Sequence, residues 1–247
     1  MKIITVTSGK GGVGKTTTAI NLGTALNSFG KEVIIVDANL TTPNVGLHLG
    51  APIVPVNLNH VMQGKAKVTD AIYEHDSGTK IIPSSLSIKE LKRINHEKLK
   101  DVAKKLRGLA DFVILDSAAG LGNEAASSIE AADELIVVTN PEITAVTDAL
   151  KTIKLAQEFG KPVRGVIVTR VSGDKNEMSI GNIREMLDLP ILGVVPEDRS
   201  ILASLRHKDA VIHTYPYSRS ALAYKKIAAK MAGVNYKEPG FWQKLFG

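Results

Sequence analysis

The sequence predicts an α/β fold with a doubly wound, mostly parallel sheet flanked by helices. Short apolar runs alternate along the chain with runs of helical periodicity. The apolar runs are continuous instead of alternating with polar residues, which indicates strands buried on both faces. The 247 residues are 44% hydrophobic, which is enough for one large core.

Six apolar runs are the expected strands: residues 3–6, 33–36, 112–115, 135–138, 166–168 and 191–195. Helices are expected at 17–29, from 143 onward, at 218–231 and, with many basic residues, at 87–107. Residues 51–82 are weakly patterned and predict short helices plus a strand near 80–82. Since the carboxyl ends of parallel strands meet at one rim of the sheet, a ligand is expected there.

The residues between the first strand and the first helix match the phosphate-binding loop pattern G-x-x-x-x-G-K-[ST]. Its glycines let backbone N–H groups approach phosphate oxygens, and the helix N-terminus adds partial positive charge. Lys15 is expected to reach the β- and γ-phosphates, and the Thr16 hydroxyl to bind Mg²⁺. The predicted nucleotide-binding residues here are Gly9, Lys10, Gly11, Gly12, Val13, Gly14, Lys15, Thr16 and Thr17.

Two other interpretations of this loop compete with the first. Residues 9–14 also satisfy G-x-G-x-x-G, the dinucleotide fingerprint, and Asp37 ends the next strand, where a ribose-binding carboxylate would lie. A purely structural glycine turn is the third interpretation. Lys15 and Thr16 favour the phosphate loop, because a dinucleotide site needs neither side chain.

A second acidic group stands at the end of the buried run 112–115. Asp116 occupies the position where phosphate-loop proteins hold a carboxylate near the metal. A strand-end aspartate also caps helices. Beside a phosphate loop, the metal-site interpretation is the stronger one.

Composition excludes several classes of site. The chain has no cysteine, so it has no disulfide, thiolate metal site or cysteine nucleophile. No apolar run approaches the roughly 20 residues of a membrane-spanning helix, and the start enters a strand directly, so no signal peptide is expected. The net charge of +6 and the basic stretch 87–107 indicate a solvated surface, with a nucleic-acid patch as the alternative.

The last seven residues contain three aromatic side chains, including the only Trp. On a helix, four apolar side chains would share one face, beside a lysine, and this favours an interfacial membrane anchor over a tail packed on the domain. The predicted membrane-contacting residues are Phe241, Trp242, Lys244, Leu245 and Phe246. A tail this short binds weakly alone, which favours a dimer. The predicted division is a nucleotide-binding domain at 1–234 and a linker with tail at 235–247.

Four stretches together resemble the MinD/ParA family of phosphate-loop ATPases, and its MinD branch most closely. They are the loop 10–17 with its additional lysine, Asp-Ser-Ala-Ala-Gly at 116–120, Thr-Asn-Pro-Glu at 139–142, and the tail 240–247. Ala118 stands where the family usually has proline. The loop alone indicates the wider family, whereas the third and fourth stretches point to the MinD branch.

The resemblance implies an ATPase that uses ATP and Mg²⁺, with Thr16, Asp37 and Asp116 at the metal. ATP would join two copies face to face, Lys10 would reach the partner's phosphates, and the paired tails would bind an anionic membrane. Hydrolysis would release the protein from the inner face of the cell membrane to the cytoplasm. The dimer would position the division machinery or another protein cargo. The family's base contacts fall here on Arg170, Pro196, Glu197 and Asp198.

One position departs from the family. Its usual D-x-D reads Asp37-Ala38-Asn39, and the second aspartate is the one thought to activate the attacking water. A neutral amide cannot accept a proton as a carboxylate does, although Asn39 would still be able to orient a water. The sequence therefore predicts slow hydrolysis and a long-lived ATP dimer.

Two other functions stay open from the sequence. One is an ATP-held membrane scaffold with negligible turnover, which Asn39 favours. The other is a ParA-like switch that binds DNA without sequence preference, which the +6 charge and the basic stretch favour and the tail opposes. A kinase or transferase would share the phosphate loop, but no motif marks an acceptor pocket.

Overall fold

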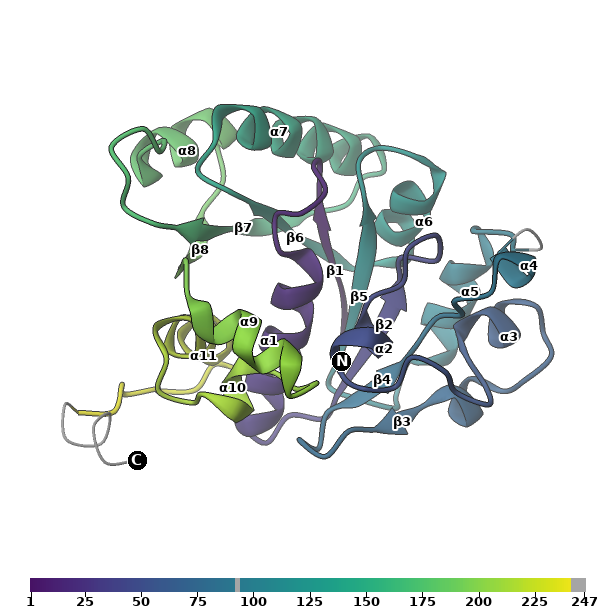
Figure 1. Ribbon diagram of the computed structural model, residues 1–247. Helices are drawn as coiled ribbons and strands as arrows, with labels where there is room; N and C mark the ends of the chain where they lie inside the picture. The colour runs from purple at the N-terminus through teal and green to yellow at the C-terminus, as the bar shows by residue number, and fades with distance from the viewer. Residues whose placement is uncertain (92–93, 241–247) are drawn as a thin grey trace.

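The computed structural model describes residues 1–91 and 94–240, and it confirms the predicted doubly wound sheet with helices on both faces (Figure 1). The strands are β1 (Lys2–Ser8), β2 (Val33–Ala38), β3 (Tyr73–Glu74), β4 (Lys80–Ile82), β5 (Phe112–Ala119), β6 (Glu134–Thr139), β7 (Val163–Val171) and β8 (Ile191–Pro196). They form one sheet in the order β3-β4-β2-β5-β1-β6-β7-β8. Neighbouring strands are parallel except β3 and β4, which pair antiparallel at one edge.

Most of the helices lie between strands in the sequence, the last three that the structure describes follow the final strand, and together they cover the sheet. They are α1 (Lys15–Ser28), α2 (Val45–His48), α3 (Leu58–Met62), the 3₁₀ turn η1 (Val68–Ala71), α4 (Ile88–Leu91), α5 (Lys98–Lys105), α6 (Asn123–Ala131), α7 (Ile143–Glu158), α8 (Ile180–Leu187), α9 (Arg199–Arg206), α10 (Val211–Thr214) and α11 (Arg219–Ala232). None of the helices in the described residues is both long enough and apolar enough to cross a bilayer.

Alternate residues of each strand pack into cores on opposite faces of the sheet. Ile35 lies in the core beneath α1, α10 and α11, whereas Ile34 lies in the core beneath α3 and α5. The same division separates Ile4 from Ile3 in β1. This period of two, with both faces buried, explains why the sequence shows continuous apolar runs.

Two of the central strands extend further than the apolar runs predict. β2 continues through Asp37 and Ala38, and β5 continues through Asp116 to Ala119. Asp37 pairs with Asp116 across the two parallel strands, and Ala38 pairs with Ser117. The two acidic residues therefore lie inside the sheet, side by side, and not in the loops that follow it.

The prediction of one basic helix over 87–107 is wrong. α4 ends at Leu91, residues 94–97 are not helical, and α5 begins at Lys98. The Asn95 side chain accepts a hydrogen bond from the Glu97 backbone N–H at 3.0 Å, a local turn that competes with helix formation. Several basic residues of this region are also paired, as in Lys100–Glu130 and Arg107–Asp133.

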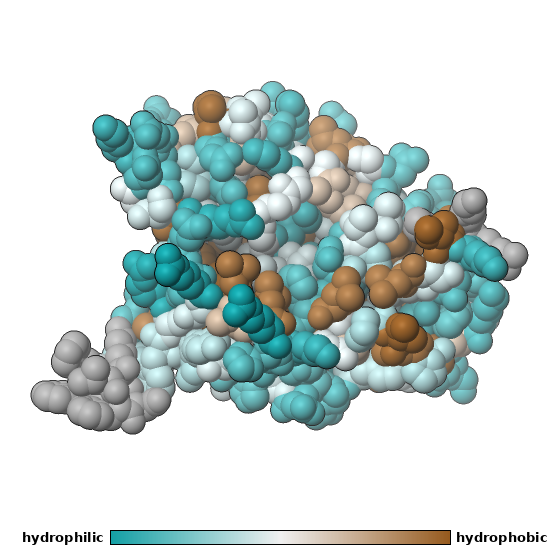
Figure 2. Space-filling view, viewed as in Figure 1, coloured by the Kyte–Doolittle hydropathy of each residue, from teal (hydrophilic) through white to brown (hydrophobic). Residues whose placement is uncertain are grey.

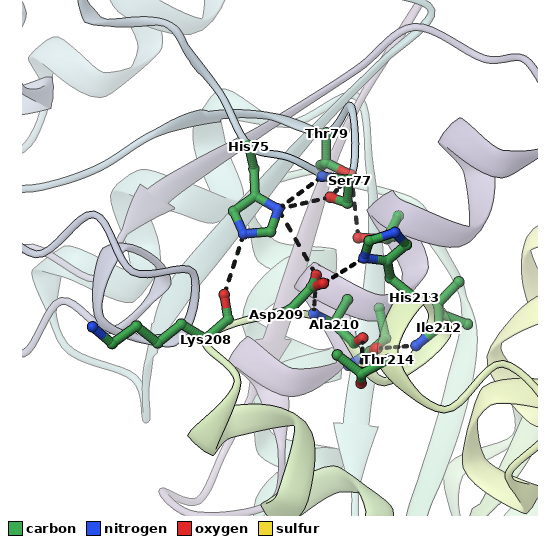
Figure 3. A network of polar contacts seen from close by, with 11 residues as sticks. His75, Ser77, Thr79, Lys208, Asp209, Ala210, Ile212, His213 and Thr214 are labelled. Carbon is green, nitrogen blue, oxygen red and sulfur yellow. Dashed lines mark hydrogen bonds and ion pairs between the residues drawn. The ribbon is translucent and has the colours of Figure 1, made fainter.

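A polar cluster joins the β3–β4 turn to the segment that precedes α10 (Figure 3). The Ser77 backbone N–H donates to His75 Nδ1 at 3.1 Å, so the ring proton lies on Nε2, which donates to the Lys208 carbonyl at 3.2 Å. Asp209 lies between the rings of His75 and His213. The contacts of His75 with Lys208 and Asp209 connect residues more than 130 positions apart, and sequence patterns did not predict them.

The segment after α11 is attached to the domain, although its composition predicts a linker. The Tyr236 ring packs edge-on against Phe29, at the end of α1, with 5.6 Å between centroids. Glu238 forms an ion pair with Lys226 of α11. The predicted membrane residues Phe241, Trp242, Lys244, Leu245 and Phe246 lie outside the described residues.

Candidate functional site

The phosphate loop connects β1 to α1 at the carboxyl rim of the sheet. Gly14 precedes the first helical residue with φ of 90°, a left-handed conformation that favours glycine. A Cβ on Gly9 would lie 2.1 Å from the Asp148 carbonyl oxygen, so α7 packs too closely for any side chain there. Val13 is held by its carbonyl, which accepts a hydrogen bond from the Thr169 hydroxyl at 2.6 Å. The backbone shape thus requires the glycines that the motif supplies.

Lys15 is the basic group of the loop, and it is buried, with 8% of its surface exposed. Burial lowers its pKa, and the neighbouring Asp116 carboxylate partly offsets the effect. Lys15 borders a cavity of about 360 Å³, which Gly11, Gly12, Thr16, Thr17 and Asn39 also line. A buried cation beside a glycine loop is suited to bind phosphate oxygens.

The carboxyl groups of Asp37 and Asp116 are fully buried on adjacent strands. Asp37 Oδ2 accepts the backbone N–H groups of Asn44 and Val45, each at 2.9 Å. Asp116 Oδ2 accepts the Thr16 hydroxyl at 2.6 Å. Within the described part of the chain, the Oδ1 atom of each aspartate has no hydrogen-bond partner.

This arrangement raises the pKa of both acids. Burial, and then the charge of Asp116, raise the pKa of Asp37 well above its usual value, against the lowering effect of backbone N–H groups. Burial raises the pKa of Asp116 to about 6, although the Thr16 hydroxyl and Lys15 lower it. Two unpartnered carboxylate oxygens beside a threonine hydroxyl are hard oxygen ligands, so the residues fit Mg²⁺.

Lys10 extends from the start of the loop toward the solvent. Its Nζ lies 3.1 Å from Glu142 Oε2, and the two side chains are 44% and 56% exposed. Glu142 ends the Thr-Asn-Pro-Glu stretch and precedes α7. An ion pair this exposed contributes at most about 1 kcal/mol, so Lys10 exchanges partners readily.

Asn39 borders the phosphate-loop cavity, but its side chain is bonded to the turn that follows. Its Oδ1 accepts the Thr42 backbone N–H at 3.3 Å and the Thr42 hydroxyl at 3.1 Å. Its Nδ2 donates to the Thr42 carbonyl at 2.7 Å. The amide is therefore held at the cavity wall, where it shapes the turn between β2 and α2.

A second cavity, of about 250 Å³, adjoins the loop at Gly14 and Thr17 and is lined by Arg170, Pro196, Glu197 and Asp198. The structure therefore brings the predicted base contacts together. Arg170 has φ of 54°, a backbone conformation that is uncommon outside glycine.

The side-chain oxygens of Asp198 are both bonded within the protein. Oδ1 accepts the Ser200 N–H at 2.9 Å at the start of α9, and Oδ2 accepts the backbone N–H and hydroxyl of Ser220, each at 3.0 Å. Burial opposes these hydrogen bonds, which nevertheless lower the pKa of Asp198. The carboxylate therefore joins the start of α9 to α11 at the pocket wall.

Sequence reasoning missed two residues at these cavities. Tyr224 of α11 lines the second cavity and shares a hydrogen bond with Thr18 at 3.2 Å; burial raises its pKa to about 12. His48 of α2 lines the phosphate-loop cavity, and burial lowers its pKa. Neither belongs to a motif, and each is brought to its cavity by packing of distant elements, so the sequence carried no signal for them.

Comparisons with known proteins agree with the fold and this geometry. The AAA domain family model (AAA_31) matches residues 1–163. An ATP-binding protein of Methanocaldococcus jannaschii is 42% identical over 95% of this chain and 89% of its own length. The septum site-determining protein MinD of Neisseria meningitidis is 32% identical over 100% of this chain and 99% of its own.

A solved structure of the septum site-determining protein MinD from Pyrococcus horikoshii, complexed with Mg-ADP, superposes with a TM-score of 0.90. It is 35% identical and covers 93% of this chain and 95% of its own. The similarity of sequence and fold to these proteins thus extends over nearly the whole chain, including the phosphate loop. The chain belongs to the MinD/ParA family of phosphate-loop ATPases.

Proposed function

We propose that the protein is a MinD-like ATPase switch, in which ATP joins two copies at a membrane and hydrolysis separates them. One observation supports the switch above the others: Asp37 and Asp116 leave buried carboxylate oxygens unpartnered beside the buried cation Lys15. That arrangement favours binding of a divalent metal with a polyphosphate. ATP and Mg²⁺ are its cofactors, because both fit the site. One relative is named as an ATP-binding protein, and another was solved in complex with Mg-ADP.

Lys15, Thr16, Asp37 and Asp116 form what we call the phosphate corner, and their positions support roles in hydrolysis. Lys15 and the loop N–H groups neutralise the phosphates, and Thr16 with Asp116 would hold Mg²⁺, which supplies further charge neutralisation at the transferred group. Asn39 borders the same cavity but carries no titratable oxygen. Slow turnover is therefore part of the proposal.

Two features support a face-to-face dimer. Lys10 is exposed, and among the residues that the structure describes its side chain forms only a surface ion pair, which leaves it able to move to a partner's phosphates. Large apolar side chains are exposed after the carboxyl ends of four strands, at Leu47, Leu121, Ile143 and Leu202. Figure 2 shows apolar surface across the middle of this view, over α9 and beside α2. Exposed apolar patches of this kind mark association surfaces.

Membrane attachment, a cytoplasmic pool and the positioning of division machinery or other cargo complete the proposal. They rest on the aromatic tail sequence and on relatives named for septum-site determination. The DNA-binding alternative loses support, since the basic stretch is not one helix and several of its cations are paired.

The direct test is the mass of the full chain by light scattering with Mg-ATP, Mg-ADP or no nucleotide. The proposal expects a dimer with Mg-ATP alone, and a monomer for Lys10→Ala under every condition. Sedimentation with anionic vesicles then compares the full chain with one ending at Glu238. A mass that does not change with Mg-ATP would exclude the switch, and pelleting that is undiminished by truncation would exclude the tail as anchor.

A further inference from the structure

We infer that the groove between β8 and α11 is a second membrane contact, which binds the headgroups of anionic phospholipids. This inference rests on the proposed membrane attachment through the tail. It adds a surface of the folded domain, and so an orientation, to an attachment that otherwise depends on seven residues.

The groove lies along the edge strand of the sheet. It has a volume of about 470 Å³, and its apolar lining includes Leu192 and Val194 of β8 with Leu222 of α11. A Cβ on Gly193 would lie 2.4 Å from Ile227 Cγ1, so α11 packs directly onto this strand. β8 pairs only with β7 in the described residues, and its other edge opens onto this groove.

The polar lining is predominantly basic. Arg219, Lys226 and Lys230 are spaced by seven and four residues, which places them on one face of α11. Arg219 donates to the Glu197 carbonyl at 3.2 Å, and Lys226 pairs with Glu238. Lys230 makes no ion pair with any residue that the structure describes. Three cations above an apolar floor match a phosphate headgroup and the upper part of its acyl chains.

The groove reaches the segment from which the tail starts. Glu238 lines it, and the next two residues complete the described chain at Gly240. Phe241, the first apolar residue of the tail, is three residues beyond Glu238, a reach of about 10 Å even if fully extended. Figure 1 shows α11 and the end of the described chain at the same corner of the molecule. A tail inserted into the membrane would therefore hold this groove among the headgroups.

The Glu238 carboxylate would compete with a lipid phosphate for Lys226. In the free protein it neutralises Lys226, and a lipid phosphate would have to displace it. Removing this carboxylate should strengthen binding to anionic membranes, whereas removing the lysines should weaken it. These opposite signs separate a headgroup site from general loss of folding.

The experiment uses the full chain with Mg-ATP and vesicles of phosphatidylglycerol and phosphatidylcholine. Lys226→Gln with Lys230→Gln should weaken binding about 25-fold, at about fivefold per charge. Glu238→Gln should strengthen it severalfold. The matched control is Lys104→Gln with Lys105→Gln on α5, which removes the same charge elsewhere and should change binding less than threefold. Equal losses in both double variants, or none in the first, would overturn the inference.

A second measurement does not depend on the tail. Short-chain dihexanoyl phosphatidylglycerol, kept below its micelle concentration, is titrated into the full chain and followed by NMR. Shifts at Leu192, Leu222 and Lys230, absent with dihexanoyl phosphatidylcholine, support the groove even if the tail proves not to be an anchor. Shifts spread over all basic surfaces, or none, refute the groove while leaving the ATP switch untouched.

Discussion

The phosphate corner and the second cavity, which Arg170, Glu197 and Asp198 line, are adjacent at the rim of the sheet, but their buried polar groups differ in whether they are hydrogen-bonded. At the phosphate corner, Asp37 and Asp116 each leave a buried oxygen unpartnered, and Lys15 is desolvated. At the second cavity, both oxygens of Asp198 are hydrogen-bonded, and the Thr169 hydroxyl is shared among Val13, Thr139 and Asn140.

The difference shows which part of the site needs its ligand. Unpartnered buried charge is unfavourable in the free protein, and Mg²⁺ with phosphate relieves it. The Asp198 and Thr169 side chains at the second cavity are already hydrogen-bonded, so a ligand there should change the stability of the domain less. Nucleotide binding should therefore act on the protein mainly through its phosphates.

Lys15→Ala should have the largest effect, because it removes the buried cation of the phosphate corner. Loss of a charge-assisted phosphate contact of this kind corresponds to about 3–4 kcal/mol, or a 100- to 1,000-fold weaker Kd for Mg-ADP. Calorimetric titration measures it. Lys31→Ala, at a half-buried lysine just before β2 and so at the opposite edge of the sheet, serves as the control. A change below tenfold for Lys15→Ala would contradict the role given to this lysine.

Asp116→Asn should stabilise the nucleotide-free protein by about 1–3 kcal/mol at pH 8, since it removes one of two adjacent buried carboxylates. The pKa of each aspartate is raised in the fold, so the native state holds protons that the unfolded chain releases above pH 4. Stability of the parent should thus rise as pH falls from 8 toward 5, and this rise should shrink in the variant. Thermal unfolding across that range tests both statements, and a less stable variant would oppose them.

Asn39→Asp should raise the rate of ATP hydrolysis about tenfold or more, because it restores a proton acceptor at the wall of the phosphate cavity. The new carboxylate is still able to accept hydrogen bonds from Thr42, but it cannot replace the Asn39 Nδ2 donor to the Thr42 carbonyl. Steady-state phosphate release with vesicles present is the measurement. An unchanged rate would mean that the amide is not what limits turnover.

Asp198→Ala should have the smallest effect on nucleotide affinity and a measurable effect on folding. It removes the cap of α9 and the acceptor of Ser220, for a loss of about 1–2 kcal/mol of stability. The Kd for Mg-ADP should change less than about threefold. A loss of affinity without loss of stability would show that the carboxylate contacts the base instead.

The sequence predicted the phosphate loop and the parallel sheet because both depend on local patterns. It placed Asp37 and Asp116 on the correct strands near the carboxyl rim, although both strands continue past them, and their pairing depends on β2 and β5 being neighbours, which no local pattern encodes. The region predicted as one basic helix is interrupted near Asn95, whose side chain accepts a hydrogen bond from the Glu97 N–H. The spacing of charged residues does not reveal such a turn. The contact of His75 with Asp209 joins segments that only the folded chain brings together.

The central claim is that the buried pair Asp37 and Asp116, whose pKa values are raised in the free protein, binds protons more readily than free aspartates do and releases them when Mg²⁺ and phosphate bind. Calorimetric titration of Mg-ADP at pH 6, near the raised pKa of Asp116, in buffers of different ionisation enthalpy, counts the protons released on binding. The account predicts net release for the parent, up to about one proton, and much less for Asp116→Asn if it retains binding. Equal heats in all buffers for the parent would contradict it.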